Sequence, residues 1–299
     1  MIQERAAERA AVDGVALGVI VLLTALWGFQ QVSVKWIAAE VPLVMQAALR
    51  SIIATVLLLA WARLRGIRLF DADGTGRAGI VAGLLFAGEF VFIYAGLAHT
   101  NASRMSVFIY LAPPLTALGL HFFVSSERLS LRQWTGVLLA FAGIVIAFAE
   151  GFGSGRSTWL GDLCGVVAAA LWAATTVVIR ATRLSRATAT KTLFYQLGVS
   201  SLVLALASVL LGEKGIGAVT PMVAASLAYQ GAIVAFASYL AWFWLLTRYR
   251  AAPLAVLSFL TPMFGMLSGA FFLSEPISAA FAAAALCVAA GIVLVNLRR

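Results

Sequence analysis

The sequence predicts an all-α integral membrane protein whose ten transmembrane helices form two inverted five-helix repeats. Three observations predict this fold: an apolar composition, long segments without charge, and one motif that occurs in both halves. Of the 299 residues, 63% are hydrophobic and only 11% are charged. Because a soluble domain carries roughly 25% charged residues, a chain of this composition could not cover its surface with polar groups. We therefore expect a multi-pass protein in a lipid bilayer.

Long charge-free segments set the lengths of the predicted helices. Asp, Glu, Lys and Arg are absent from residues 14–34, 105–126, 192–212, 251–274 and 276–297. Each segment can cross the hydrocarbon core, which takes about 20 helical residues. Together with the remaining apolar segments, they give the predicted spans 15–36, 42–64, 78–98, 104–124, 131–149, 160–180, 191–211, 221–246, 252–273 and 276–297.

One sequence motif occurs in both halves of the chain. Pro113, inside the fourth predicted span, corresponds to Pro262 inside the ninth. Glu127, which follows the fourth span, corresponds to Glu275 after the ninth. An interior proline removes a backbone hydrogen bond and kinks its helix, so we expect the same kink in both copies. The chain therefore divides into two predicted units, residues 1–149 and 150–299.

The predicted units have opposite orientations in the membrane. Each contains five spans, an odd number, so the chain enters the second unit from the other side. The loop after the second span holds Arg63, Arg65, Arg68 and Arg77, whereas its counterpart after the seventh span holds only Lys214. Because Lys and Arg collect in cytoplasmic loops, both termini are predicted to be cytoplasmic. Such inverted repeats are typical of transporters that expose a midplane site alternately to the two sides.

Small residues within the spans predict where helices pack closely. We expect close packing at the pairs with GxxxG spacing, which are Gly14/Gly18, Gly79/Gly83, Gly161/Gly165 and Gly265/Gly269.

Two charged residues lie inside predicted spans. Glu89 is roughly ten residues from either end of the third span, about 15 Å deep at a rise of 1.5 Å per residue. A charge at that depth is costly, so it is functional by default and faces a cavity. We expect Glu89 to bind a substrate amine or to carry a proton; the alternative is a structural carboxylate with a partner. Arg50 in the second span pairs with Glu89, contacts a substrate carboxylate, or extends to the interface.

Aromatic residues are the other candidates for a binding site. Trp27 and Trp172 occupy corresponding positions in the first span of each unit. Most membrane tryptophans form belts at the interfaces, but these two lie too deep for that. They either line a cavity or pack between helices. A buried tyrosine needs a hydrogen-bond partner, and we expect Tyr94 and Tyr110 to shape an apolar pocket together with the two tryptophans.

Motifs of enzymes, ATP-driven pumps and metal sites are absent from the sequence. It contains no GxxxxGK[ST], GxSxG or HExxH. Cys164 and Cys287 lack the spacing of a metal site or a disulfide framework. We therefore expect no catalytic residue, no cofactor and no bound metal. The net charge of +9 is spread over short loops rather than one patch, which disfavours nucleic-acid binding.

Two segments resemble the paired signature of the drug/metabolite transporter superfamily, EamA type: LAPPLTALGLHFFVSSERLSLRQWTGVLLAFAGIVI and FLTPMFGMLSGAFFLSEPISAAFAAAALCVAAGIVL. The Leu-Trp-Gly around Trp27 and Arg50 look like further family features. Within the superfamily, Gly88-Glu89 and the Tyr-Leu-x-Pro that begins at Tyr110 are similar to the bacterial aromatic amino-acid exporters. The second copy departs from the first at the position of Glu89, where Ser238 stands, so any acidic function is asymmetric.

The resemblance implies a ten-helix exporter of the bacterial inner membrane, with a central cavity and with aromatic and other neutral amino acids as substrates. We expect a secondary transporter that works by alternating access on amino acids and other small metabolites. One alternative is an efflux transporter for cationic drugs, in which Glu89 would pair with the cation. Another is a channel or a membrane protein that transports nothing. The sequence leaves the substrate range, the driving ion and the oligomeric state open, with a monomer as the expectation.

Overall fold

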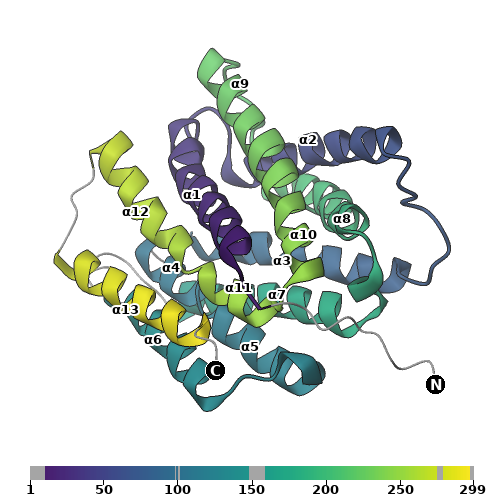
Figure 1. Ribbon diagram of the computed structural model, residues 1–299. Helices are drawn as coiled ribbons and strands as arrows, with labels where there is room; N and C mark the ends of the chain where they lie inside the picture. The colour runs from purple at the N-terminus through teal and green to yellow at the C-terminus, as the bar shows by residue number, and fades with distance from the viewer. Residues whose placement is uncertain (1–10, 98, 100–101, 148–158, 275–278, 297–299) are drawn as a thin grey trace.

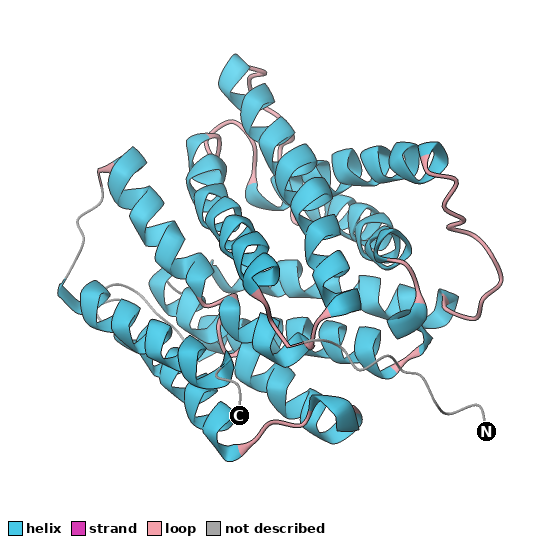
Figure 2. Ribbon diagram, in the orientation of Figure 1, coloured by secondary structure: helices cyan, strands magenta, loops and turns pink. Residues whose placement is uncertain are grey.

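The computed structural model describes residues 11–97, 99, 102–147, 159–274 and 279–296, and all regular structure in them is helical (Figures 1 and 2). The first half holds α1 (Gly14–Trp36), α2 (Leu43–Leu64), α3 (Gly76–Leu97), α4 (Ala102–Ile109), α5 (Ala112–Phe123), the 3₁₀ turn η1 (Ser125–Glu127) and α6 (Leu131–Ala147). The second half holds α7 (Trp159–Ala181), the 3₁₀ turn η3 (Arg183–Arg186), α8 (Ala189–Leu210), α9 (Pro221–Ala228), the π-helix η4 (Tyr229–Ser238), α10 (Tyr239–Arg248), α11 (Ala251–Leu257), α12 (Leu260–Leu273) and α13 (Ala279–Asn296).

The helical membrane fold is confirmed. Within the described residues, seven helical stretches are long and apolar enough to cross a membrane, and three shorter apolar helices accompany them. Large apolar side chains cover the outside, such as Leu202 at 75% exposure and Phe271 at 81%. Polar side chains such as Gln46 and Gln230 are buried instead. This distribution suits a helix bundle surrounded by hydrocarbon. The number of membrane spans and the side of the membrane on which the termini lie stay predictions.

The two corresponding prolines interrupt their helices at matching places. The chain leaves regular α-helix between α4 and α5, two to three residues before Pro113, and between α11 and α12, three to four residues before Pro262. A proline ring clashes with the carbonyl one helical turn earlier and offers no N–H to it. The predicted kinks therefore occur in both copies. Glu275, the predicted partner of Glu127 in the repeat, lies outside the described residues.

Helix packing follows the sequence repeat. The first helix of the first half, α1, packs against α12, and its counterpart α7 packs against α4 and α5. Two further contacts join corresponding helices, α2 with α8 and α6 with α13. Figure 1 shows α6 and α13 side by side at the lower left, with α2 and α8 on the opposite side of the molecule. Each half is thus packed mainly against the other.

Glycines permit some of these contacts. A Cβ on Gly83 would lie 2.6 Å from the backbone oxygen of Tyr195 in α8, and one on Gly165 would lie 2.7 Å from Cβ of Phe108. The prediction of close packing is therefore confirmed at these two positions. It is wrong for Gly14 and Gly18, because no atom would lie within 4 Å of a Cβ at either. That face of α1 is open to the surroundings.

Polar contacts fasten α2 to α8 at both ends. At the end where α8 begins, the buried ammonium of Lys191 binds Asp71 and Asp73, which lie in the loop between α2 and α3. Hydrogen bonds from Lys191 and Thr75 hold the pKa of Asp73 well below its usual range. At the other end, the carboxylate of Glu213 accepts hydrogen bonds from the first backbone N–H groups of α2. An acidic group is favourable at a helix N-terminus.

We call the end of the molecule at which Lys191 binds Asp71 and Asp73 the basic end. There the α2–α3 loop meets the turn between α7 and α8, and the ends of α5, α7 and α10 also lie there. It carries Arg68, Arg128, Arg186 and Arg248.

Gly28 provides a test of the contact between α1 and α12. A Cβ there would lie 2.6 Å from the backbone nitrogen of Gly265 and 2.7 Å from the backbone carbon of Phe264. Because backbone cannot move aside cheaply, Gly28→Ala should destabilise the protein by about 1–3 kcal/mol. Thermal unfolding in detergent measures the change.

The matched control is Gly18→Ala on the same helix. A methyl group there meets nothing, and alanine favours helix over glycine by up to about 1 kcal/mol. A Gly28→Ala variant as stable as Gly18→Ala would contradict the packing described for α1 and α12.

Candidate functional site

Glu89 lies in the interior of the bundle. It is on α3, 8% exposed, and α3 runs close to α7 and α8 because small residues face them. Gly88 beside it leaves only 3.2 Å between an added Cβ and Leu171 of α7. Among the described residues, the Glu89 carboxylate accepts no hydrogen bond and has no cation within 4 Å. It is therefore available to a ligand or a proton.

Arg50 supplies the opposite charge. It lies on α2 with 2% exposure, and its guanidinium carbon is 4.3 Å from the ring centroid of Phe90. Its charge acts on Glu89, Tyr94 and Tyr239, and its Nε is buried without a hydrogen-bond partner in the described residues. Of the three roles predicted for Arg50, extension to the interface is thus wrong, because α3 and α10 cover the side chain. A cation over an aromatic ring is stabilised by the ring's quadrupole.

Trp27 marks one side of this region. Its indole Nε1 donates a 2.8 Å hydrogen bond to Oγ of Ser238, the residue that corresponds to Glu89 in the repeat. Its ring makes edge contacts with Tyr239 and Trp242 of α10, with centroids 6.0 and 5.6 Å apart. Trp27 therefore joins α1 to the π-helix η4 and to α10.

Trp172 and Tyr110 mark the other side. Their ring centroids are 6.1 Å apart, and Tyr110 is also 6.1 Å from Phe259. Tyr110 lies at the break between α4 and α5, and Phe259 at the corresponding break between α11 and α12. The charge of Glu89 acts on Tyr110 and also on Tyr239 across the interior. Glu89 therefore lies between the two aromatic groups.

The six predicted residues comprise two groups joined by ring contacts and the charge of Glu89, which acts on both groups; we call the whole set the aromatic–charge cluster. It consists of Trp27, Arg50, Glu89, Tyr94, Tyr110 and Trp172 with the connecting rings Phe86, Phe90, Tyr239, Trp242 and Phe259. Tyr94 joins it through Phe90, at a centroid distance of 6.4 Å.

Sequence reasoning missed the connecting rings. Phe86, Phe90 and Tyr94 follow one another at intervals of four residues on α3, and the ring centroids of Phe86 and Phe90 are 5.2 Å apart. Side chains at this spacing share one helix face, so the stripe was visible in the sequence. Tyr239 and Trp242 are three residues apart and also share one face of α10, but their spacing alone does not tell whether that face points inward.

The helix before α10 departs from ordinary geometry. η4 is a π-helix of ten residues, Tyr229–Ser238, whereas the matching part of α3 is regular α-helix. Its Gly231 lets Ile53 of α2 approach, since an added Cβ would lie 2.6 Å from Ile53 Cγ2. π-helical segments frequently occur at functional sites. Here the segment ends at Ser238, directly beside Trp27.

The cluster offers a carboxylate, a guanidinium and aromatic surfaces within one apolar interior. Among the described residues, no three His, Cys, Asp or Glu side chains gather as metal ligands would. The groups present suit a small ligand that carries both charges and an apolar part.

A double-mutant cycle measures whether Arg50 and Glu89 are coupled. Arg50→Met should destabilise the wild-type protein more than it destabilises a Glu89→Gln background, by about 0.5–3 kcal/mol, which is typical of interacting pairs. The reason is that Arg50 supplies the positive charge that acts on Glu89. Thermal unfolding in detergent gives the four stabilities.

The control cycle combines Arg50→Met with Glu40→Gln in the loop between α1 and α2, where additive effects are expected. Additive effects in the Arg50/Glu89 cycle as well would show that the two charges do not interact.

Comparison with known proteins agrees with this architecture. The sequence profile described as "EamA-like transporter family" matches residues 15–149 and again residues 159–297. A solved structure described as "Crystal structure of protein" superposes with a TM-score of 0.80 at 23% identity, over 95% of this chain and 98% of the other. At that identity, the likeness shows the fold.

Relatives of similar length are named as transporters. "Uncharacterized transporter YvbV" of Bacillus subtilis (strain 168) is 26% identical over 280 residues, which cover 93% of this chain and 90% of the relative. "Probable amino-acid metabolite efflux pump" of Salmonella typhimurium is 23% identical over 280 residues, with 91% of each chain covered. The prediction of a transporter rather than an enzyme is thereby confirmed. The chain is a multi-pass membrane protein that belongs to the EamA-like transporter family.

Proposed function

We propose that this transporter exports amino acids, aromatic and other neutral ones, across the bacterial inner membrane by alternating access around the aromatic–charge cluster. The observation that carries the proposal is the burial of opposite charges, Glu89 and Arg50, among aromatic rings. A free amino acid presents an ammonium group, a carboxylate and a side chain. Glu89 would bind the first, Arg50 the second, and the rings of Trp27, Tyr110 and neighbouring residues the third.

The energetics of burial support a zwitterionic substrate. Charges inside the membrane are costly and mark substrate or ion pathways. A zwitterion adds no net charge to the interior and supplies a partner to each buried group. A cationic drug would satisfy Glu89 alone and would meet the positive charge of Arg50, which disfavours the alternative of cation efflux.

The sequence repeat supports alternating access. The matched helix breaks before Pro113 and Pro262 bring Tyr110 and Phe259 against each other within the cluster. In the predicted inverted topology, residues 1–149 and 150–299 are the two units that rock around this point, and the basic end is the cytoplasmic one. The name of the Salmonella relative and the similarity of Gly88-Glu89 to aromatic amino-acid exporters favour amino acids as substrates.

Uptake into proteoliposomes tests the substrate class. Labelled phenylalanine should enter saturably, and neutral amino acids should compete. Phenylethylamine, which lacks the carboxylate, and phenylpropionate, which lacks the ammonium group, should each compete at least about tenfold less well, because each leaves one buried charge without a partner. A pH gradient shows whether protons drive the uptake.

Glu89→Gln should abolish uptake or its response to the pH gradient, whereas Glu40→Gln should leave both unchanged. Phenylethylamine competing as well as phenylalanine would refute the role of Arg50. Uptake of a cationic dye without uptake of phenylalanine would replace the proposal by cation efflux. Unaltered, gradient-dependent uptake by Glu89→Gln would rule out its role in coupling.

A further inference from the structure

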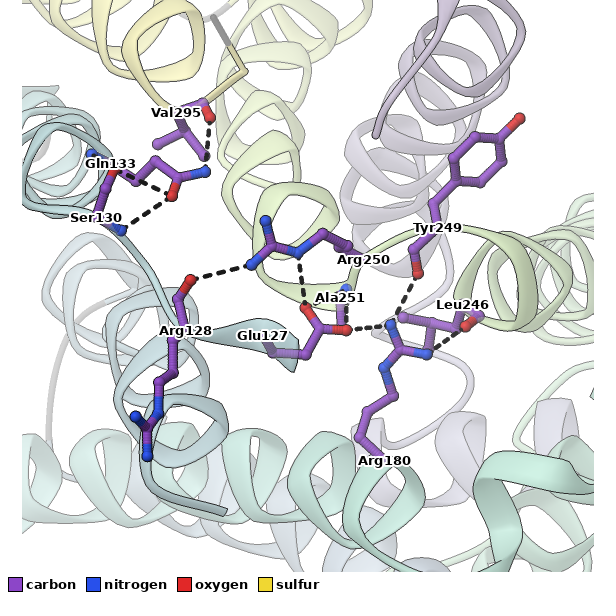
Figure 3. Close-up of polar contacts among 10 residues, drawn as sticks. All are labelled: Glu127, Arg128, Ser130, Gln133, Arg180, Leu246, Tyr249, Arg250, Ala251 and Val295. Carbon is purple, nitrogen blue, oxygen red and sulfur yellow. Dashed lines mark hydrogen bonds and ion pairs between the residues drawn. The ribbon is translucent and has the colours of Figure 1, made fainter. Parts of the chain in front are cut away.

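A second pair of buried opposite charges lies at the basic end, away from the cluster. Glu127 ends the turn η1 after α5, and Arg180 lies in the last turn of α7. Glu127 is 2% exposed and Arg180 5%. Nη2 of Arg180 donates a hydrogen bond to Oε1 of Glu127 (Figure 3). The pair therefore joins the first half of the chain to the second.

The same two side chains hold the turn between α10 and α11. Both carboxylate oxygens of Glu127 accept a hydrogen bond from the backbone N–H of Ala251, the first residue of α11, at 3.1 Å. Arg180 donates to the carbonyls of Leu246 and Tyr249 at the end of α10, at 2.7 and 2.8 Å. An anion thus lies at a helix N-terminus and a cation at a helix C-terminus, as the helix dipoles favour.

Neighbouring contacts extend this junction, as Figure 3 shows for Arg250. Arg250 is 3.8 Å from Glu127 through Nε and donates to the carbonyl of Arg128 at 3.1 Å. The hydroxyl of Tyr249 donates to Asp13, which caps α1, at 3.0 Å. The ends of α1, α5, α7, α10 and α11 therefore meet at one place.

Several aromatic residues of the cluster lie on these helices or next to their ends, whereas Phe86, Phe90 and Tyr94 lie on α3. Trp27 lies on α1 and Trp172 on α7, while Tyr239 begins α10. Tyr110 and Phe259 lie at the far ends of α5 and α11 from the junction. A path from the cluster that ran between these helices to the basic end would meet the Glu127–Arg180 pair, where their ends are joined. The contacts of Lys191 and Glu213, by contrast, fasten α2 to α8.

We propose that the Glu127–Arg180 pair is the cytoplasmic gate of the transport cycle and that it is closed in this structure. The proposal rests on the proposed alternating access. In the closed state, each charge is satisfied by the other and by backbone groups of α10 and α11. In the open state the helix ends separate, and water enters the basic end and solvates both charges. The gate therefore has two distinct states, closed and open, rather than a continuous range of positions. The turn between α10 and α11 then stays with Glu127 or with Arg180, depending on which of the two keeps its hydrogen bonds to that turn.

Sided cysteine labelling tests the gate without any substrate. The reporter is Ala255→Cys in a background of Cys164→Ala and Cys287→Ala. Ala255 is buried on α11, between Ala251 at the junction and Phe259 of the cluster. A membrane-impermeant maleimide is applied to the cytoplasmic face in inside-out vesicles and to the other face in right-side-out vesicles.

Glu127→Gln should raise the rate of labelling from the cytoplasmic face at least about tenfold, because removing one partner of a buried pair disfavours the closed state. The rate from the opposite face should not rise. Asp73→Asn, which removes one of the two carboxylates paired with Lys191 at the basic end, should change neither rate.

Arg250→Gln is a second variant in case Glu127→Gln does not fold. Arg250 is partly exposed and farther from Glu127 than Arg180 is, so the Arg250→Gln protein should fold and show a smaller increase in labelling rate, from the cytoplasmic face alone.

Equal increases in labelling rate from both faces would mean that the pair only stabilises the fold, and would overturn the proposal. The proposal would also be overturned if folded Glu127→Gln were labelled at the same rates as the Ala255→Cys protein without that substitution. If Glu127→Gln does not fold, the same holds for Arg250→Gln. Failure of phenylalanine uptake would refute the proposed substrate but would leave these labelling results to be judged by themselves.

Discussion

Hydrocarbon cannot solvate a charge, and this constraint governs where the charged side chains of the bundle lie. Glu127 meets Arg180 and a helix N-terminus, and Glu213 meets the N-terminus of α2. The same constraint makes the interior of α2 and α3 exceptional. There Arg50 and Glu89 are buried, and among the described residues neither forms an ion pair within 4 Å of the kind that joins Glu127 to Arg180. A site for a charged ligand is the physical reason we propose for retaining them.

Much of the fold could be predicted because the membrane imposes simple rules on the sequence. Charge-free length located the long helices, and Pro113 and Pro262 located the breaks. The π-helix η4 could not be predicted, since it depends on backbone packing such as that of Gly231 against Ile53. Helix orientation about the axis was equally inaccessible, which is why Gly18 was wrongly expected to pack closely.

Prediction of the candidate site succeeded for residues that are unusual in their own segment. A carboxylate or a tryptophan deep in a span is conspicuous by itself, and Glu89 and Trp27 were found in this way. Tyr239 gains its place only from its neighbours across the interior. Glu127 was noticed as a mark of the repeat, but its partner Arg180 is far away in sequence and belongs to the other half. Pairings of that kind depend on how the halves are packed.

The difference between the two halves shapes the proposed cycle. The first half contributes Glu89 and Arg50, whereas Ser238 at the corresponding position in the second half accepts the hydrogen bond of Trp27. Counterflow tests alternating access around this site most directly. Proteoliposomes preloaded with unlabelled phenylalanine should transiently accumulate external labelled phenylalanine above its equilibrium level, because each reorientation of a carrier exchanges one molecule for another. Rapid, non-saturating equilibration without such an overshoot would indicate a channel and would contradict the account.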